Sequence, residues 1–393
     1  MKILIISPGY YPVPAVKGGA VENLIENLVR CKEITEKHKI TLYTIYDKEA
    51  ISEEKNIKCQ FKYINVNKIG YKIKRIIRHI INKYSNKYIG NEYINSVVKD
   101  IKKCEEKYDI IIVQNQPEYG LILDKIKKNS KLILHLHNDY LNIHTKNCMR
   151  IYNIYDRIFS ISNFLNDRVN QIDPSVSKSK LLYNGVDITR FDPNKFDVIN
   201  LRKKYSFDKN DFIFVYAGRI VKEKGIKELI NAFSNINNKK AKLLILGKRQ
   251  KGGKSYYNEI LKLIKKDKNI ILKENVSYNK IPELYAISNV GIVPSIWNEP
   301  FGLVVVEILA SGLPVIASKQ GALKEIINPT IEGRLVEYDK DFINNLTQEM
   351  IFYLNIEEDK YKLIKSKAVQ DSKKFTNEIY VQNFLRLIEE EKK

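Results

Sequence analysis

The stretch VGIVPSIWNEPFGLVVVEILASGLPVIAS, residues 290–318, contains the pattern that decides the fold. An apolar run at 290–295 is followed by a short loop, an apolar segment of helical pattern at 301–312 and a second apolar run at 314–318. Short, continuous apolar runs on either side of a helix are typical of parallel strands that are buried on both faces. The stretch therefore predicts one strand–helix–strand unit of a parallel sheet.

The same alternation extends outward through the chain. We expect further strands and helices in both halves, which predicts an α/β fold of two Rossmann-like, doubly wound parallel-sheet domains. The expected strands of the first half are 2–7, 39–46, 109–115, 131–137 and 157–162. In the second half we expect strands at 211–220, 241–248 and 269–276, and helices at 224–236, 256–266 and 280–288.

Chain length agrees with two domains, because 393 residues exceed the size at which one hydrophobic core keeps growing. Gly, Asp and Pro interrupt the alternation at about 184–200, where we place a linker. The predicted domains are 1–190 and 195–374, with a final helix at about 375–393 that crosses back onto the first domain. Ligands of such sheets bind at the carboxyl ends of the strands, so we expect a site in the cleft between the domains.

The net charge of +21 suggests an anionic partner or surface. Residues 62–91 contain no acid and eight bases: Lys62, Lys68, Lys72, Lys74, Arg75, Arg78, Lys83 and Lys87. Isoleucines recur among them at helical spacing, as in an amphipathic helix on anionic lipid. The alternative is a solvated basic helix with one face on the core. Binding of nucleic acid is not favoured.

Nothing in the sequence predicts a secretory leader or a membrane-spanning helix, since the apolar run at the start is short and fits a buried strand. The four cysteines are scattered without a Cys-x-x-Cys pair, which favours reduced thiols. We therefore expect a cytoplasmic protein that can be peripheral at the inner face of the plasma membrane through residues 62–91.

Two glutamates bracket the central helix of the opening stretch. Glu299 is expected to project from the loop into the cleft, whereas Glu307 lies about two turns into the helix. The amides of Phe301, Gly302 and Leu303 are predicted helix-start donors that suit an anion. A carboxylate that accepts two hydroxyl hydrogen bonds is a usual way to hold a ribose diol, which fits Glu307.

Two cations follow the first strand of the second half. Arg219 and Lys224 lie just beyond this strand, and Lys224 is expected to open a helix. Paired positive charges at the carboxyl end of a strand suit a diphosphate that must leave. In a chain this basic, two surface cations without a ligand are the alternative.

Taken together, these segments resemble the retaining glycosyltransferases of family 4, the group 1 glycosyltransferases of the GT-B fold. Their two glutamates with seven residues between them appear here as Glu299 and Glu307, and their Gly-Arg and Lys-Gly pairs appear in GRIVKEKG, residues 218–225. The resemblance spans nearly the whole chain, because further family segments follow in order: GGA at 18–20, SNF at 162–164, NGVD at 184–187, ASGLPVIAS at 310–318 and EGRLVE at 332–337.

The resemblance implies roles for the residues of the second half. Glu299 would contact the hydroxyls of the donor sugar, and Glu307 would hold the ribose of the nucleotide. Arg219 and Lys224 would stabilise the departing diphosphate, with help from the amides at 301–303. Backbone around Val276 would hold the base.

For the first half, the resemblance implies that the loop with Gly18 and Gly19 brings backbone amides to the phosphates. It also places His137 at the donor sugar, near its 6-position. The implied enzyme is a retaining, metal-independent hexosyltransferase without a cofactor. Its donor would be a nucleotide sugar, with UDP as the expected nucleotide, and its acceptor a saccharide or a polyprenyl-diphosphate-linked saccharide in surface polysaccharide or glycoconjugate assembly.

Three alternatives remain open. His135, His137 and Asp139 resemble the beginning of a zinc-ligand pattern, which would suit a metal-dependent hydrolase. A sugar-nucleotide epimerase would share the same fold. A non-catalytic protein that binds lipid or nucleic acid would depend on charge alone. A nicotinamide dehydrogenase is disfavoured, because no Gly-x-Gly-x-x-Gly occurs.

Overall fold

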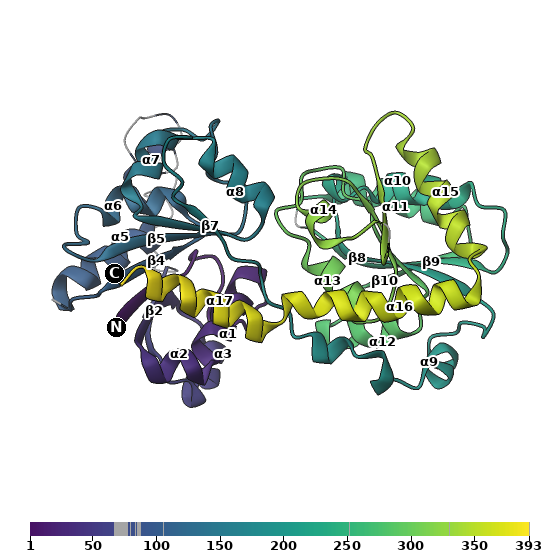
Figure 1. Ribbon diagram of the computed structural model, residues 1–393, viewed down its shortest axis with the longest axis horizontal. Helices are drawn as coiled ribbons and strands as arrows, with labels where there is room; N and C mark the ends of the chain where they lie inside the picture. The colour runs from purple at the N-terminus through teal and green to yellow at the C-terminus, as the bar shows by residue number, and fades with distance from the viewer. Residues whose placement is uncertain are drawn as a thin grey trace. The chain divides into compact units, whose positions relative to one another are not determined.

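The computed structural model describes residues 1–66, 78, 80–82, 84, 88–104, 106–250, 252–329 and 331–392. The chain forms two compact units (Figure 1). Unit 1 comprises Met1–Gly185 and Asn377–Lys393, and unit 2 comprises Val186–Thr376. The chain thus leaves unit 1 once and returns to it with its last helix.

Unit 1 is built on a parallel sheet. In the described part of the chain this sheet has seven strands in the order β3-β2-β1-β4-β5-β6-β7. In register, Ile5 lies opposite Leu42 and Ile112. The strands are β1 (Lys2–Ile6), β2 (Lys39–Ile45), β3 (Gln60–Ile64), β4 (Ile110–Gln114), β5 (Lys131–Leu136), β6 (Arg157–Ser160) and β7 (Ser179–Leu181).

Helices cover both faces of this sheet, because successive side chains of a strand point to opposite sides. Leu4 and Ile6 pack with α5 and α7 on one face, whereas Ile3 and Ile5 pack with α1 and α17 on the other. The helices are α1 (Ala20–Arg30), α2 (Lys32–Lys37), α3 (Lys48–Glu53), α5 (Glu92–Cys104), α6 (Gly120–Leu123), α7 (Cys148–Ile154), α8 (Asn163–Asn170) and α17 (Asn377–Glu390), with short 3-10 turns η1 (Glu54–Asn56) and η2 (Pro117–Tyr119).

Unit 2 repeats the design with a second parallel sheet. Its described strands are six, in the order β10-β9-β8-β11-β12-β13. They are β8 (Phe212–Ile220), β9 (Ala241–Arg249), β10 (Ile270–Glu274), β11 (Val290–Val293), β12 (Val315–Ser318) and β13 (Gly333–Val336). Phe214 and Tyr216 of β8 pack into the core under α10, α11 and α15, which lie together on one side of the sheet in Figure 1.

The central helix of the opening stretch, α13 (Leu303–Ala310), packs closely on β11: a Cβ at Gly291 would lie 2.4 Å from the Ile308 side chain. The other helices of unit 2 are α9 (Val198–Lys204), α10 (Ile226–Ser234), α11 (Lys254–Ile264), α12 (Ile281–Ala286), α14 (Leu323–Ile326), α15 (Phe342–Leu354) and α16 (Glu358–Ser372), with 3-10 turns η3 (Ile188–Phe191), η4 (Pro193–Lys195), η5 (Lys222–Lys224), η6 (Tyr278–Lys280) and η7 (Lys373–Phe375).

The predicted fold class is confirmed, and each of the predicted strands is present. Three short strands, β3, β7 and β13, were not predicted. The segment expected to be a linker, 184–200, contains η3, η4 and the start of α9 and belongs almost wholly to unit 2. In the described residues no helix is both long and apolar enough to cross a membrane.

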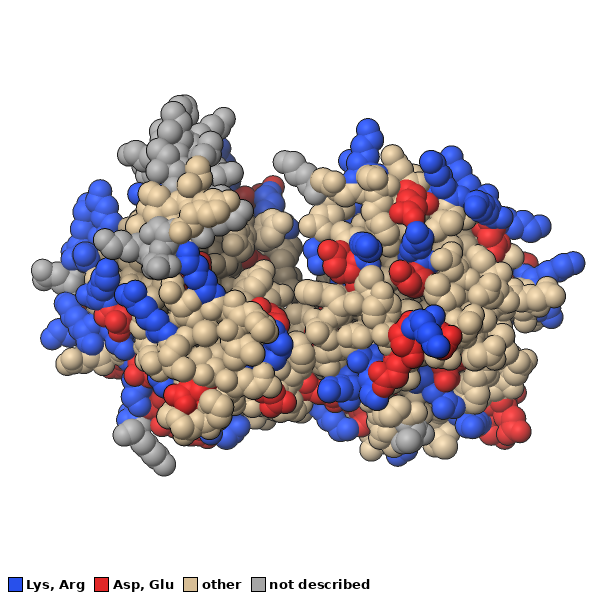
Figure 2. Space-filling model, turned by 90° about the horizontal axis from the view of Figure 1, so that it is seen from above, with Lys and Arg blue, Asp and Glu red and all other residues tan. Residues whose placement is uncertain are grey.

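Basic side chains are spread over the surface of both units, with acidic side chains among them (Figure 2). The described bases of the 62–91 segment, Lys62 and Arg78, lie 3.9 Å and 2.9 Å from carboxylate oxygens of Asp100 and Glu92 on α5. The remaining bases of that segment, on which the lipid hypothesis depends, lie outside the described residues.

Candidate functional site

The loop between β11 and α13 holds Glu299 in a fixed place. Its backbone forms a bridge with Gly321, and its carbonyl accepts a hydrogen bond from the amide of Ala322 at 2.9 Å. Gly321 has a φ of +59°, and a Cβ there would lie 2.4 Å from the Glu299 carbonyl oxygen. Only glycine fits this approach, so the loop at 321 fixes the backbone from which the carboxylate extends.

The Glu299 carboxylate is buried and paired. The side chain of Lys224 forms an ion pair with it, and the hydroxyl of Ser295 donates a hydrogen bond to the same oxygen, Oε1. Glu299 is only 6% exposed. The sequence predicted separate tasks for Glu299 and Lys224, whereas the structure joins the two side chains, so each orients the other.

Lys224 ends the turn η5 and does not open a helix, contrary to expectation. The helix α10 begins at Ile226, after Gly225 in the left-handed conformation with a φ of +66°. A Cβ at Gly225 would lie 1.9 Å from the carbonyl oxygen of Pro294. Residue 225 is therefore restricted to glycine. The Lys224 ammonium lies 5.6 Å from the centre of a Trp297 ring.

Arg219 lies near the end of β8, opposite Lys248 in register. Its side chain is exposed and donates a hydrogen bond to Gln250 Oε1 at 3.2 Å. The hydroxyl of Tyr216 donates to the Arg219 carbonyl at 3.0 Å, which fixes the backbone there. Arg219 remains a predicted phosphate ligand.

The helix α13 begins at Leu303, two residues later than expected, because Gly302 has a φ of +114° that is not helical. The N-cap residue is Gly302, which has no side chain to accept hydrogen bonds from the amides of the first turn. Phe301 is buried and packs edge-to-face on Phe375, with ring centres 5.7 Å apart. The predicted anion-binding start of the helix therefore comprises the amides from Leu303 onward.

Glu307 lies among buried apolar neighbours on α13 and is 8% exposed. Burial raises the pKa of its carboxyl to about 7, and two groups oppose that rise. The hydroxyl of Tyr278 donates a hydrogen bond to Glu307 Oε1 at 2.8 Å, and the positive charge of Arg190 lies nearby. The structure thus supplies Glu307 with a donor and a cation, which favour its ionised form.

Tyr278 and Arg190 were not predicted from the sequence. Tyr278 lies two residues after Val276, in the loop that follows β10, and Arg190 lies in η3. The guanidinium carbon of Arg190 lies 4.5 Å from the centre of the Tyr278 ring. From the sequence, this loop was expected at the nucleotide only through the backbone around Val276, which was predicted to hold the base.

In unit 1, His137 follows the end of β5 and is buried. Its Nε2 lies 2.9 Å from Gln114 Oε1, and its backbone amide donates to Asn115 Oδ1 at 3.0 Å. Burial lowers the pKa of His137 to about 3, so its imidazole is neutral at physiological pH. The ring of His135 lies 4.1 Å from that of His137 and is fully buried.

Asp139 does not complete a metal site with these two histidines. Its carboxylate forms an ion pair with Arg168 at 2.7 Å and accepts a hydrogen bond from Asn142 at 2.9 Å. No cluster of three or more potential metal ligands occurs among the residues that the structure describes. The arrangement therefore lends no support to the hydrolase alternative.

Gly18 and Gly19 both have positive φ, +76° and +112°, and immediately precede α1. A Cβ at Gly19 would lie 2.2 Å from a carboxylate oxygen of Glu22. Glu22 is buried, which raises its pKa, and the backbone amide of Tyr11 hydrogen-bonds to it. The two glycines are thus required by the loop geometry, and their contact with phosphate remains a prediction.

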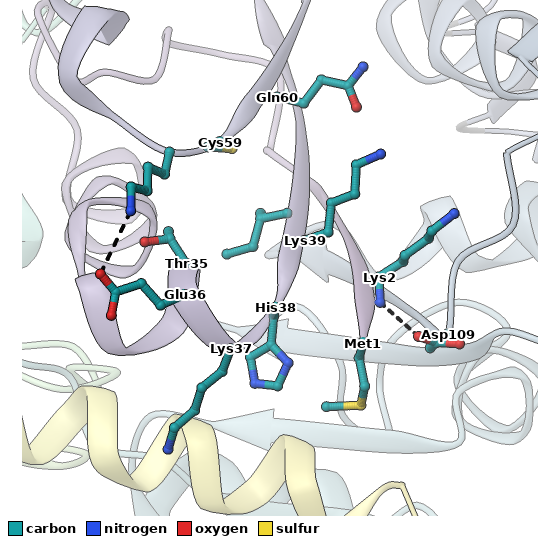
Figure 3. Close-up of a pocket in the computed structure, with 12 residues that line it drawn as sticks. Met1, Lys2, Thr35, Glu36, Lys37, His38, Lys39, Cys59, Gln60 and Asp109 are labelled. Atoms are coloured by element: carbon teal, nitrogen blue, oxygen red, sulfur yellow. Dashed lines mark hydrogen bonds and ion pairs between the residues drawn. The ribbon is translucent and has the colours of Figure 1, made fainter.

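Unit 1 contains a hollow of about 590 Å³ around the start of its first strands (Figure 3). Lys2, Lys39 and Gln60, the first residues of β1, β2 and β3, line it. Ligands of parallel sheets bind at the carboxyl ends of the strands. This hollow at the amino ends is therefore separate from the candidate site.

Comparisons with known proteins identify the family of the chain and agree with its fold. Residues 197–370 match the family described as "Glycosyl transferases group 1", and residues 20–190 match "Glycosyltransferase Family 4". Spore coat protein SA of Bacillus subtilis is 25% identical over 360 residues, which cover 88% of this chain and 87% of that protein. The lipopolysaccharide 1,2-N-acetylglucosaminetransferase of Salmonella typhimurium is 28% identical over 241 residues, 59% of this chain and 60% of that enzyme.

Among solved structures, Anabaena HepE in complex with UDP and glucose is similar, with a TM-score of 0.76 and 19% identity over 99% of both chains. This likeness shows the two-sheet GT-B fold. The two family matches together cover most of the chain, one in each unit. The chain therefore belongs to the group 1 glycosyltransferases of family 4.

Proposed function

We propose that the protein transfers a sugar with retention of anomeric configuration from a UDP-sugar to a saccharide or lipid-linked saccharide acceptor. The proposal rests on two buried glutamates of unit 2, Glu299 just before helix α13 and Glu307 within it. Glu299 is held by Lys224 and Ser295, and Glu307 by Tyr278.

Each side of this arrangement suits one part of a nucleotide sugar. Glu307 would accept hydrogen bonds from the ribose hydroxyls, and Glu299 from hydroxyls of the donor sugar. Arg219, Lys224 and the amides at the start of α13 would neutralise the diphosphate between them. No divalent metal is needed in this scheme, because the two side-chain cations take the charge of the leaving group.

In the proposed reaction the acceptor hydroxyl attacks the anomeric carbon from the face that the diphosphate leaves. The bond between the acceptor oxygen and this carbon forms as the bond to the phosphate oxygen breaks, and the acceptor proton passes to a phosphate oxygen. The protein acts by position and charge rather than through a covalent intermediate.

Two relatives support the choice of substrates. HepE forms a complex with UDP and glucose, and the Salmonella relative is named as a transferase of N-acetylglucosamine to lipopolysaccharide. We accordingly propose surface polysaccharide or glycoconjugate assembly as the process in which the acceptor occurs.

A panel of nucleotide sugars tests the proposal. The purified protein is mixed with UDP-, GDP-, ADP- and dTDP-sugars, and thermal stabilisation and release of the nucleoside diphosphate are measured with and without saccharide acceptors. We expect a UDP-sugar to stabilise the protein and to lose its sugar faster with an acceptor, and the anomeric proton coupling of the product to match that of the donor. An absence of stabilisation and turnover with every donor would refute the proposal.

A further inference from the structure

Tyr278 combines exposure with a fixed orientation. Its side chain is 50% exposed, yet its hydroxyl donates to the buried Glu307 carboxylate at 2.8 Å. Phe191 packs edge-to-face against the ring, with ring centres 6.2 Å apart. The ring and the hydroxyl of this exposed side chain are both already fixed. Ligand binding beside it would therefore cost little further conformational entropy.

Arg190 secures this tyrosine from a second element. Its guanidinium lies 4.5 Å from the centre of the Tyr278 ring and donates to Asn279 Oδ1 at 2.6 Å. The hydrogen bond connects η3 to the residue next to Tyr278, and the cation over the ring stabilises the same orientation. Arg190 and Tyr278 therefore act as one unit beside Glu307.

Glu307 needs such support because its helix is apolar. A carboxyl accepts hydroxyl hydrogen bonds most strongly when it is ionised, and burial raises the pKa of Glu307 to about 7. The ionisable groups that face it are Tyr278 from η6, Arg190 from η3 and Tyr285 from α12. The first two lower the pKa of Glu307, whereas the Tyr285 hydroxyl is buried without a protein partner.

We propose that Tyr278, held by Arg190 and Phe191, positions the Glu307 carboxylate so that its second oxygen receives the ribose hydroxyls of the nucleotide. This inference rests on the proposed function, since it assigns a positioning residue to the same nucleotide site. Tyr278 bonds to Oε1 and leaves Oε2 to the ligand. Loss of the phenol hydroxyl would free the carboxylate to rotate and would favour its protonation.

Calorimetry on Tyr278→Phe tests the inference. The titrant is the nucleoside diphosphate that stabilises the wild type most, expected to be UDP. Tyr278→Phe should weaken its binding about tenfold, because a hydrogen bond to a charged group is lost. The matched control is Tyr205→Phe, which removes a tyrosine–glutamate bond of 2.7 Å to Glu283 in the same unit and should leave the affinity unchanged.

Two further readouts separate positioning from a general structural effect. The affinity for UDP-glucose, whose diphosphate does not titrate near neutrality, should rise with pH through about 7 in the wild type, and at a higher pH in Tyr278→Phe and Arg190→Gln. With 2′,3′-dideoxy-UDP, which lacks both ribose hydroxyls, wild type and Tyr278→Phe should differ by less than about twofold.

Equal or tighter binding of UDP by Tyr278→Phe would overturn the inference, as would an equal loss with the dideoxy nucleotide. If the wild type and Tyr278→Phe bind the nucleotide with the same affinity, only this inference is rejected. A wild type that binds no nucleoside diphosphate rejects the proposed function together with it.

Discussion

Two pairs of buried polar side chains, one pair in each unit, differ in the partners that surround them. In unit 2, Glu299 is paired with Lys224 and Ser295, and Glu307 accepts a hydrogen bond from Tyr278. In unit 1, His135 is fully buried and neither of its ring nitrogens has a hydrogen-bond partner among the described residues, whereas His137 has one bonded nitrogen. Of these two pairs, only the carboxylates have partners that stabilise their charged forms.

The difference shows how burial decides protonation. A buried group without a counter-charge avoids ionisation, and burial lowers the pKa of both histidines. A buried carboxylate with a cation or a hydroxyl donor can remain charged and be held in one orientation. The partners of Glu299 and Glu307 thus favour the charged form of each carboxylate and hold it in one orientation, whereas His135 and His137 are neutral.

The largest expected effect comes from breaking the charged pair of unit 2. Glu299→Ala should lower kcat by about 10²- to 10³-fold, because it removes the proposed contact to the reacting sugar. The dissociation constant of UDP should change little, since the proposed ribose contact at Glu307 remains. Steady-state kinetics and calorimetry measure the two quantities.

The matched control is Glu337→Ala, which removes an exposed glutamate paired with Lys319 in the same unit. This variant should keep its activity. Normal turnover by Glu299→Ala would contradict the sugar-facing role of Glu299.

A backbone change next to Lys224 has the second-largest expected effect. Gly225→Ala places a Cβ 1.9 Å from the Pro294 carbonyl oxygen at a φ of +66°. We expect a loss of about 2–3 kcal/mol in the free energy of unfolding, from the unfavourable backbone conformation and the clash. Urea unfolding measures the loss; for comparison, Gly252→Ala has a positive φ but no atom within 4 Å of the added Cβ. If Gly225→Ala cost no more than Gly252→Ala, the clash would not constrain the loop.

The histidine pair makes a prediction about pH. His135 stays neutral in the folded protein but gains a proton in the unfolded chain below its ordinary pKa of 6.5. The unfolded state thus binds more protons, and the free energy of unfolding falls as the pH falls below that value. When the pH falls from about 7.5 to 5.5, the free energy of unfolding of His135→Leu should therefore decrease by about 1.4 kcal/mol less than that of the wild type.

Urea unfolding at the two pH values gives this difference. The control is Ile133→Val, a change at a buried residue of the same strand that does not titrate, which should lose as much stability on acidification as the wild type. The same loss in His135→Leu as in the wild type would show that His135 is protonated in the folded state.

The smallest effect expected is that of metal removal. Because Arg219 and Lys224 are proposed to neutralise the leaving diphosphate, dialysis against EDTA should change turnover by less than about twofold. Activity that disappears with EDTA and returns with a divalent cation would contradict the assignment of these two residues.

Most of the fold could be predicted because its central strands are continuous apolar runs, such as Ile110–Gln114. The missed strands lack that signal. β7 has three residues, SKL, and β3 alternates polar and aromatic residues with only partial burial at the edge of the sheet. Such strands exist because a neighbouring strand offers hydrogen bonds, which is tertiary information.

The candidate site could be predicted residue by residue but not contact by contact. The glutamates stood out beside a helix, yet the pairing of Lys224 with Glu299 joins positions 75 residues apart. The delayed start of α13 depends on the φ of Gly302, and the close approach of the Pro294 carbonyl to Gly225 joins distant parts of the sequence. Tyr278 and Arg190 lie in loops without periodicity, so only the three-dimensional structure brings them to Glu307.

A crystal structure of the protein with UDP would test the central claim most directly. The account predicts that the ribose hydroxyls hydrogen-bond to the Glu307 carboxylate, with Tyr278 still on Oε1, and that the diphosphate lies against Lys224 and the first amides of α13. A nucleotide bound in unit 2 without contact to Glu307, or one bound elsewhere on the chain, would contradict it.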